Sequence, residues 1–327
     1  MSYTSITRRV ALTGAGIGLI GLAARAEGTA LSIGSGTTGG VYYPLGRAIA
    51  GILNASRPEL NAAVVATQGS IENMDGLGTG KFGVVFTQVD TAVNAADGED
   101  HFDKKPLKVR ALANLYSGHM QVVTVAASGI SRLSDLRGKR VSTGTPKSGN
   151  ENMAYRLPKV AGVDRTSEFK MHEYLSPEEG TRRILAGEFD AYFFNSGVPT
   201  ATIIDLGSAP GAALRLVDHA ELTAGIVARY GPVYFTETIP AGTYPGQWMD
   251  NKQVSVGNIL AVDAALPDAT VTAVLNAIWI GRAVLGETHK EGKNFTLNGK
   301  RPRQSEFRGT RPPRRSGVSR ERLCRSQ

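Results

Sequence analysis

The feature that most constrains the fold is a regular alternation of short apolar segments, rich in β-branched residues, with longer helical segments. Apolar segments at 31–35, 61–69 and 82–88 each lead into a helical stretch, and the alternation restarts after Gly129 with a segment at 139–146. Strands that alternate with crossover helices indicate an α/β protein with mainly parallel strands. Because the two series are of similar size, the sequence predicts two α/β lobes.

The end of the second series predicts how the lobes are connected. An apolar segment at 253–266 and a helix at 269–286 follow it, and we expect both to return to lobe one. Pairing of 254–262 with strands of lobe two alone would contradict this return. The predicted division is a signal peptide at 1–26, the first part of lobe one at 27–120, lobe two at 121–250, the return to lobe one at 251–289 and a basic tail at 290–327.

The N-terminus predicts export. Arg8 and Arg9 precede the apolar stretch VALTGAGIGLIGLA, which falls short of the ~20 residues that a membrane span needs. Ala24 and Ala26 place small side chains at the −3 and −1 positions of a cleavage site. The sequence therefore predicts a signal peptide cleaved after Ala26 and a periplasmic protein, and it leaves both Sec and twin-arginine export open.

The positive charge of the chain lies at its ends. Of its 37 Lys and Arg residues, 12 lie in 290–327 and three in 1–26, so that 27–289 carries a net charge of −4 although the whole chain carries +8. A body with this charge and no reader motif disfavours a nucleic-acid partner. The tail has two interpretations, a functional basic arm or an aberrant end such as a shifted reading frame. The single cysteine, Cys324, excludes an internal disulfide and a cysteine-based zinc site.

Polar residues, accompanied by glycines at three of the four places, occur at four points where an apolar segment ends and a helix begins. The first is 34–42, whose glycines let a ligand approach the backbone and whose hydroxyls add donors. The others are 67–73, 86–90 and 144–152, and we expect Ser70 to cap its helix. Open α/β sheets bind ligands at the carboxyl ends of strands. These segments therefore predict two facing groups of anion-binding loops, one in each lobe, which we call cradles. The alternative interpretation is that these glycines and hydroxyls only pack and cap the helices and bind no ligand.

Several segments also carry a resemblance to a known family. The segments GSGTTGGVYYPLG at 34–46, SGVPTATI at 196–203 and GTYPGQ at 242–247 resemble the TAXI family of solute receptors from tripartite (TRAP) transporters, and the likeness runs over 31–286. The resemblance implies a type II periplasmic binding protein with two α/β lobes around a ligand cleft. It further implies no catalytic activity, no cofactor, an acidic organic solute such as glutamate, glutamine or a dicarboxylate, and a membrane permease as partner.

The same resemblance implies a set of ligand-binding residues. Carried over by position, the set consists of Gly36, Thr38, Gly39, Tyr42, Gln68, Ser70, Gln88, Asp90, Ser148, Gly149, Asn150, Phe194, Ser196 and Gly197. Two arginines on the predicted helices, Arg47 and Arg156, are interpreted as solvated residues rather than ligands. The chain departs from the family at its end, where the basic tail replaces a terminal helical segment.

The main alternative is a periplasmic hydrolase on the same two-lobed scaffold. Hydrolysis would need a nucleophile, a base and an orienting acid. The five histidines fall in no HExxH or HxH pattern, and no GxSxG nucleophile elbow occurs. The sequence therefore predicts no catalytic residues and no metal ligands. It does not identify the solute or the oligomeric state.

Overall fold

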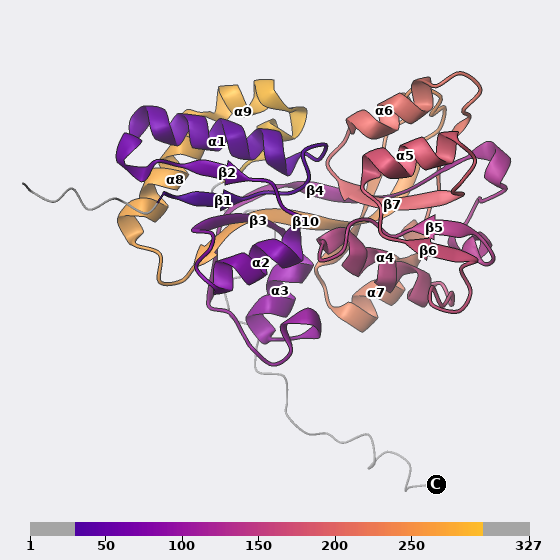
Figure 1. Ribbon diagram of the computed structural model, residues 1–327, viewed down its shortest axis with the longest axis horizontal. Helices are drawn as coiled ribbons and strands as arrows, with labels where there is room; N and C mark the ends of the chain where they lie inside the picture. The colour runs from indigo at the N-terminus through magenta and orange to yellow at the C-terminus, as the bar shows by residue number, and fades with distance from the viewer. Residues whose placement is uncertain (1–29, 297–327) are drawn as a thin grey trace, which may run out of the picture.

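A computed structural model describes residues 30–296 of the chain as a mixed α/β protein (Figure 1). The predicted signal peptide and residues 297–327 of the predicted tail lie outside the described residues. The strands are β1 (Ser32–Gly34), β2 (Ala63–Val65), β3 (Val84–Gln88), β4 (Val109–Val125), β5 (Arg140–Ser142), β6 (Met171–Glu173), β7 (Ala191–Ser196), β8 (Leu214–Leu216), β9 (Tyr234–Ile239) and β10 (Asn251–Asp263). The α/β fold predicted from the sequence is confirmed.

The strands form one sheet in the order β2-β1-β3-β10-β4-β7-β5-β6, with β8 paired to β4 and β9 paired to β10. We call lobe one the part built on β1, β2 and β3, and lobe two the part built on β5 to β9. Strands β4 and β10 extend through both lobes. The prediction of mainly parallel strands holds only within β1–β3 and within β5–β7, since every pairing of β4 and β10 is antiparallel.

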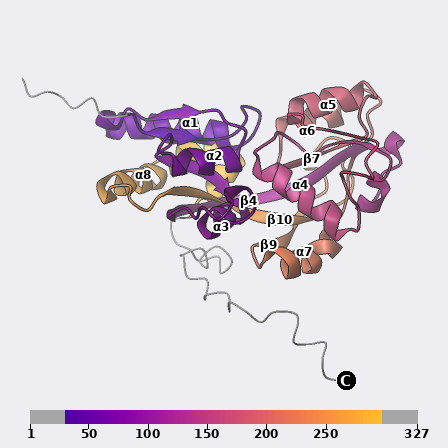
Figure 2. The same cartoon turned by 60° about the horizontal axis from the view of Figure 1, so that its bottom comes forward.

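Helices cover both faces of the sheet in each lobe (Figures 1 and 2). In lobe one, α1 (Tyr42–Ser56), α8 (Asp268–Ile280) and α9 (Arg282–Thr288) cover one face, and α2 (Ser70–Gly78) and α3 (Val89–Asp97) cover the other. In lobe two, α5 (Pro177–Leu185) and α6 (Ala201–Ser208) lie opposite α4 (Gly149–Val160) and α7 (Thr223–Tyr230). The first residues of α1, α2, α4 and α5, and Gln88 immediately before α3, come together between the lobes.

Strand β10 has the pairing that a return to lobe one requires. Its second half, from Asn258 to Val262, pairs with β3, whereas its first half pairs with β9 of lobe two. The segment 109–125 is one long strand, β4. The residue boundaries of the lobes at 120, 250 and 289 stay a prediction.

The chain remains packed on the body from Lys290 to Thr296, so the first residues of the predicted basic tail at 290–327 are part of the body. A short 3₁₀ helix spans Lys290–Asn294, and Glu291 within it is only 4% exposed. Phe295 is buried in the apolar core of lobe one, and Thr296 pairs with Asn114 beside β4. The apolar contact of one phenylalanine and the free edge next to β4 explain why this polar stretch is ordered.

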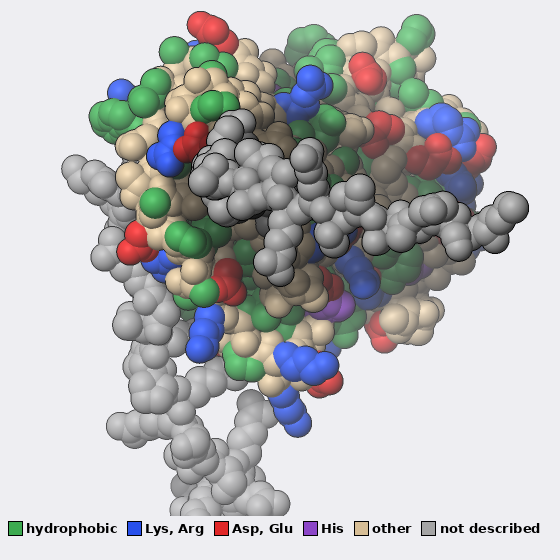
Figure 3. All heavy atoms as spheres, turned by 60° about the vertical axis from the view of Figure 1, so that its left-hand side comes forward, with side chains coloured by type: hydrophobic (Ala, Val, Ile, Leu, Met, Phe, Trp, Pro, Cys, Tyr) green, Lys and Arg blue, Asp and Glu red, His purple; other side chains and the backbone are tan. Residues whose placement is uncertain are grey.

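The surface and the helices show two further properties. On the visible part of the face shown in Figure 3, Lys and Arg side chains are interspersed with Asp and Glu side chains. Within residues 30–296, no single helix is long and apolar enough to cross a membrane, and the pair α8 and α9 passes that test only together, with a bend of 66° between them.

Candidate binding site between the lobes

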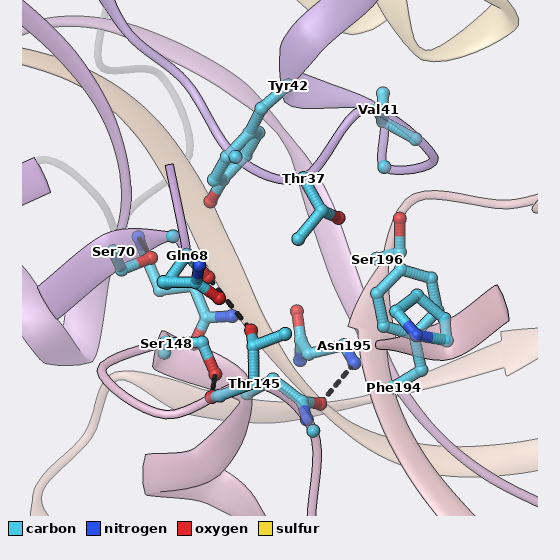
Figure 4. A pocket seen from close by; sticks show the side chains of 18 of the residues that line it. Thr37, Val41, Tyr42, Gln68, Ser70, Thr145, Ser148, Phe194, Asn195 and Ser196 are labelled. Carbon is cyan, nitrogen blue, oxygen red and sulfur yellow. Dashed lines mark hydrogen bonds between the residues drawn. The ribbon is translucent and has the colours of Figure 1, made fainter. Parts of the chain in front are cut away.

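A cavity of about 60 Å³ lies where the two lobes meet (Figure 4). Tyr42 and Thr37 of lobe one stand on one side of it, and Thr145 and Ser148 of lobe two on another. Strands β4 and β10 contribute Tyr116 and Asn258 to the lining. The lining contains aromatic, hydroxyl and amide side chains, and among the residues that the structure describes none with a formal charge faces the cavity. The lining residues are Gly36, Thr37, Gly40, Val41, Tyr42, Gln68, Gly69, Ser70, Gln88, Tyr116, Gly144, Thr145, Ser148, Gly149, Asn150, Pro177, Phe194, Asn195, Ser196 and Asn258.

The glycine-rich loop before α1 forms one wall. Ser35 is fully buried, and its hydroxyl donates to the Val65 carbonyl at 2.7 Å, which fixes the start of the loop on β2. The loop then turns so that Tyr42, the first residue of α1, points toward β10, where its hydroxyl donates to the Asn258 side chain. Burial raises the pKa of Tyr42 well above its ordinary value. The phenol therefore remains protonated and acts as a donor.

The loop between β2 and α2 forms a second wall, and it differs from the sequence prediction. The residue that caps α2 is Gly69, with a φ of 127°, and Ser70 is the first residue of the helix. The Ser70 hydroxyl instead accepts a hydrogen bond of 3.0 Å from the Gln88 backbone N–H. The predicted capping role of Ser70 is therefore wrong, because its side chain faces the end of β3 rather than the free N–H groups of its own helix.

The start of α4 forms the facing wall in lobe two. Ser148 caps this helix, accepting from the Glu151 N–H at 3.0 Å and donating to the Thr145 carbonyl at 2.6 Å. Asn150 donates to the Thr143 carbonyl at 2.8 Å and accepts from the Asn195 N–H at 2.6 Å, so it ties the helix to the end of β7. These bonds hold the first N–H groups of α4 toward the cavity.

The two walls touch one another directly. The Thr145 hydroxyl donates to the Gln68 carbonyl at 3.1 Å, and the Glu72 N–H donates to the Lys147 carbonyl at 3.1 Å. At Gly69 the backbone comes so close to lobe two that an added Cβ would lie 3.4 Å from the Ser148 Cβ. The structure therefore has the lobes closed over the cavity.

Two amide oxygens in the lining have no hydrogen-bond partner among the described residues. These are Oε1 of Gln88, a side chain only 4% exposed, and Oδ1 of Asn195. A buried polar atom without a partner costs about 1–3 kcal/mol. Both sites would be satisfied by a donor on a bound molecule or by ordered water.

With this geometry in view, the chain can be compared with known proteins. The sequence model of the NMT1-like family matches residues 33–302. This chain belongs to the NMT1-like family. The match includes every helix and strand that the structure describes, except for Ser32, the first residue of β1.

Solved structures overlap this NMT1-like protein to differing extents. A protein of Bordetella bronchiseptica RB50 overlaps it with a TM-score of 0.52 at 18% identity, over 80% of this chain and 74% of that one. The periplasmic aliphatic sulphonate binding protein SsuA of Escherichia coli gives a TM-score of 0.47 at 15% identity, over 81% and 78%. An ancestral arginine-binding protein bound to arginine also gives 0.47 at 15%, over 81% and 97%. The likeness to the Bordetella bronchiseptica protein concerns the fold alone.

Most of the residues expected in the NMT1-like protein's site lie together at the cavity. Those that line it are Gly36, Tyr42, Gln68, Ser70, Gln88, Ser148, Gly149, Asn150, Phe194 and Ser196. Thr38, Gly39, Asp90 and Gly197 are outside the lining. Gly39 packs against the Glu178 carboxylate, and Gly197 packs against Tyr116 and Glu291.

Asp90 is withdrawn from the cavity by a buried ion pair. Its Oδ2 lies 3.3 Å from Nη1 of Arg156 and accepts a 2.8 Å hydrogen bond from the Tyr234 hydroxyl. Burial raises the pKa of Asp90, and the Arg156 guanidinium opposes that shift. The interpretation of Arg156 as a solvated helix residue is wrong, because its side chain is only 4% exposed.

The sequence reasoning missed Thr37, Tyr116, Thr145, Asn195 and Asn258, all of which line the cavity. Thr145 lies in a segment that was already marked as a cradle. Tyr116 and Asn258 lie in the interior of the long strands β4 and β10. The sequence feature that could have identified them is a polar group among mostly apolar neighbours.

Proposed function

We propose that this NMT1-like protein is a periplasmic solute receptor of the TAXI type, which captures a small acidic organic solute and delivers it to a TRAP membrane permease. Glutamate, glutamine and dicarboxylates are the candidate solutes. The ten lining residues that the TAXI resemblance implied support the assignment of the cavity as the ligand site. The proposal includes export by the predicted signal peptide and no catalytic role.

The observation that carries the proposal is that five helices begin at the cavity. Tyr42, Ser70, Gly149 and Pro177 are the first residues of α1, α2, α4 and α5, and Gln88 is the residue that precedes α3. Each helix start presents backbone N–H groups that have no backbone partner within the helix, and roughly half a positive charge. Their convergence favours an anion without any arginine or lysine in the lining.

The size of the cavity supports a small solute. Its volume of about 60 Å³ is room for about four to six water molecules at 10–15 Å³ each. A solute that displaced them would occupy on the order of 120–180 Å³, at about 30 Å³ of liquid volume for each water. This is the scale of a single amino acid or a short dicarboxylate rather than of a sugar chain or a peptide.

The lining also favours a receptor over the hydrolase alternative. Ser148 donates its hydroxyl hydrogen to the Thr145 carbonyl, and Ser70 is bonded to the Gln88 N–H. Among the described residues, no histidine or carboxylate lines the cavity beside either hydroxyl. A serine nucleophile needs an adjacent base, so the constellation supports binding.

A thermal-shift screen tests the proposal. The mature chain is melted with L-glutamate, L-glutamine, succinate and fumarate, and with neutral sugars of similar size as controls. A solute present at 100 times its Kd should add about 2.7 kcal/mol to the free energy of unfolding. Stabilisation by neutral sugars alone, or by none of the acidic solutes, would contradict the proposal.

A further inference from the structure

A cluster of charged side chains, centred on the buried Arg156, joins the two lobes beside the cavity. Arg156, in the second turn of α4, directs Nη1 at Oδ2 of Asp90 at 3.3 Å and at the Tyr234 hydroxyl, and Nη2 at the Asp100 carboxylate. The guanidinium also lies over the Tyr230 ring at 4.6 Å. The Arg156 side chain is 4% exposed, that of Asp90 is fully buried and that of Asp100 is 57% exposed.

The partners of Arg156 come from different lobes. Asp90 and Asp100 belong to α3 and the turn after it in lobe one, whereas Tyr230 ends α7 in lobe two. Helices α3 and α4 are in contact at the centre of the molecule (Figure 1). The guanidinium therefore spans the junction, and rotation of one lobe away from the other would separate it from both carboxylates.

Each carboxylate is held in place by its own lobe. Asp90 accepts the Thr91 N–H at 2.7 Å through Oδ1, which leaves Oδ2 directed at Arg156. Asp100 accepts from the Asn94 side chain at 2.8 Å. Because contacts within lobe one hold both carboxylates in place, the ion cluster specifies one position of α4 on α3.

That position determines the geometry of the cavity. Asp90 is two residues from Gln88, which lines the cavity, and Arg156 is seven residues from Gly149 at the start of the same helix. At about 1.5 Å of rise per residue, the clasped turn of α4 lies roughly 10 Å from the helix start that faces the solute.

We propose that Arg156 is a positioning residue of the binding site: its ion cluster with Asp90 and Asp100 clasps α4 to α3 and holds the two cavity walls in the closed arrangement. The consequence for solute binding rests on the proposed function, whereas the clasp itself is a property of the lobes. When the lobes separate, water replaces the carboxylates around the guanidinium, so the cluster selects the closed geometry more than it adds to total stability.

Spin-label distance measurements without solute test the clasp. Labels are attached to Thr79→Cys in lobe one and Lys170→Cys in lobe two, both exposed positions, in the mature chain carrying Cys324→Ser. We expect one dominant distance in this background and a broader, longer distribution with Arg156→Met. The matched control is Arg182→Met, because Arg182 pairs with Glu179 on the surface of lobe two alone. An Arg156→Met distribution identical to the background, or an equal change in the control, would overturn the clasp.

Two further variants keep the test decisive if Arg156→Met does not fold. Arg156→Lys retains the charge and should give an intermediate distribution, and Asp100→Asn removes one exposed acceptor and should broaden the distribution less. An unchanged distribution in Asp100→Asn together with a normal melting temperature would then overturn the clasp.

Binding kinetics with L-glutamate as the probe give the second readout. We expect Arg156→Lys to raise the dissociation rate about tenfold while the association rate stays within about twofold. A lysine keeps the charge but lacks the forked guanidinium that contacts both carboxylates, and weakening a buried charge contact acts mainly on dissociation. Equal changes in both rates would contradict a clasp. If L-glutamate does not bind the unmodified chain, the assigned solute fails, and the solute-free distances still decide the clasp.

Discussion

The sharpest single perturbation of the site is Gly149→Ala. Gly149 begins α4 and faces lobe one, and an added Cβ would lie 2.5 Å from Oε1 and 2.6 Å from Cδ of Gln88, and 2.9 Å from the Ser70 hydroxyl oxygen. Such distances are below van der Waals contact, so the Gln88 amide must move or the lobes must part. Within lobe two the substitution is harmless, because alanine favours a helix over glycine.

The expected loss follows from the group that is displaced. We expect the Gln88 amide to hydrogen-bond the charged solute. Moving the amide would remove this bond, worth about 1.5–3 kcal/mol, which is about a 10- to 150-fold weaker Kd. Calorimetric titration with the solute selected by the thermal-shift screen measures this change. Wild-type affinity in Gly149→Ala would refute the assignment of the cavity as the ligand site.

The control for this variant is Gly51→Ala. Gly51 lies within α1, and an added Cβ would meet no atom within 4 Å. This variant should bind the solute as the wild type does and should unfold with a free energy higher by roughly 0.5–1 kcal/mol. A loss of affinity in the control would show that glycine replacement acts through the fold rather than through the cavity.

Three other outcomes are expected. Burial, with a smaller effect of Lys290, lowers the pKa of His119 to about 4 in the folded chain. Between that pH and about 6.5 the unfolded chain binds more protons, so the free energy of unfolding falls as the pH falls through this window. His119→Gln should remove about 3 kcal/mol of this dependence in denaturant melts. Ser148→Ala should lower the free energy of unfolding by about 1 kcal/mol through loss of the cap, measured by the same melts. Thr37→Ala should weaken solute binding by about 1 kcal/mol in calorimetry, and Thr38→Ala, which is outside the lining, by less; the reverse order would contradict the placement of the loop.

The sequence was informative about the cradles because their chemistry is local. Glycines and hydroxyls between a strand and a helix can be recognised without knowing the rest of the fold, and Gln68, Ser148 and Asn150 all line the cavity. The choice between Thr37 and Thr38 could not be made in this way. Adjacent residues of an irregular loop point in different directions, and only the packed loop determines which hydroxyl faces the cavity.

Contacts between distant segments were not predictable from local patterns. Arg156 has the spacing of an exposed helix residue, and it is buried because Asp90 and Asp100 come to it from the other lobe. In the same way, Phe295 stands in a basic, polar stretch but fills a place in the core of lobe one. Asn258 and Tyr116 were hidden because long strands through both lobes have mostly apolar neighbours.

The central claim is that an acidic solute binds between two lobes whose helix starts, rather than charged side chains, attract it. Calorimetric titration of the mature chain with L-glutamate, L-glutamine and succinate tests this claim most directly, with Gly149→Ala measured in parallel. The account predicts binding of one acidic solute per chain and at least a tenfold weaker Kd in the variant. Absence of binding by all three solutes, or binding that is unchanged in Gly149→Ala, would contradict it.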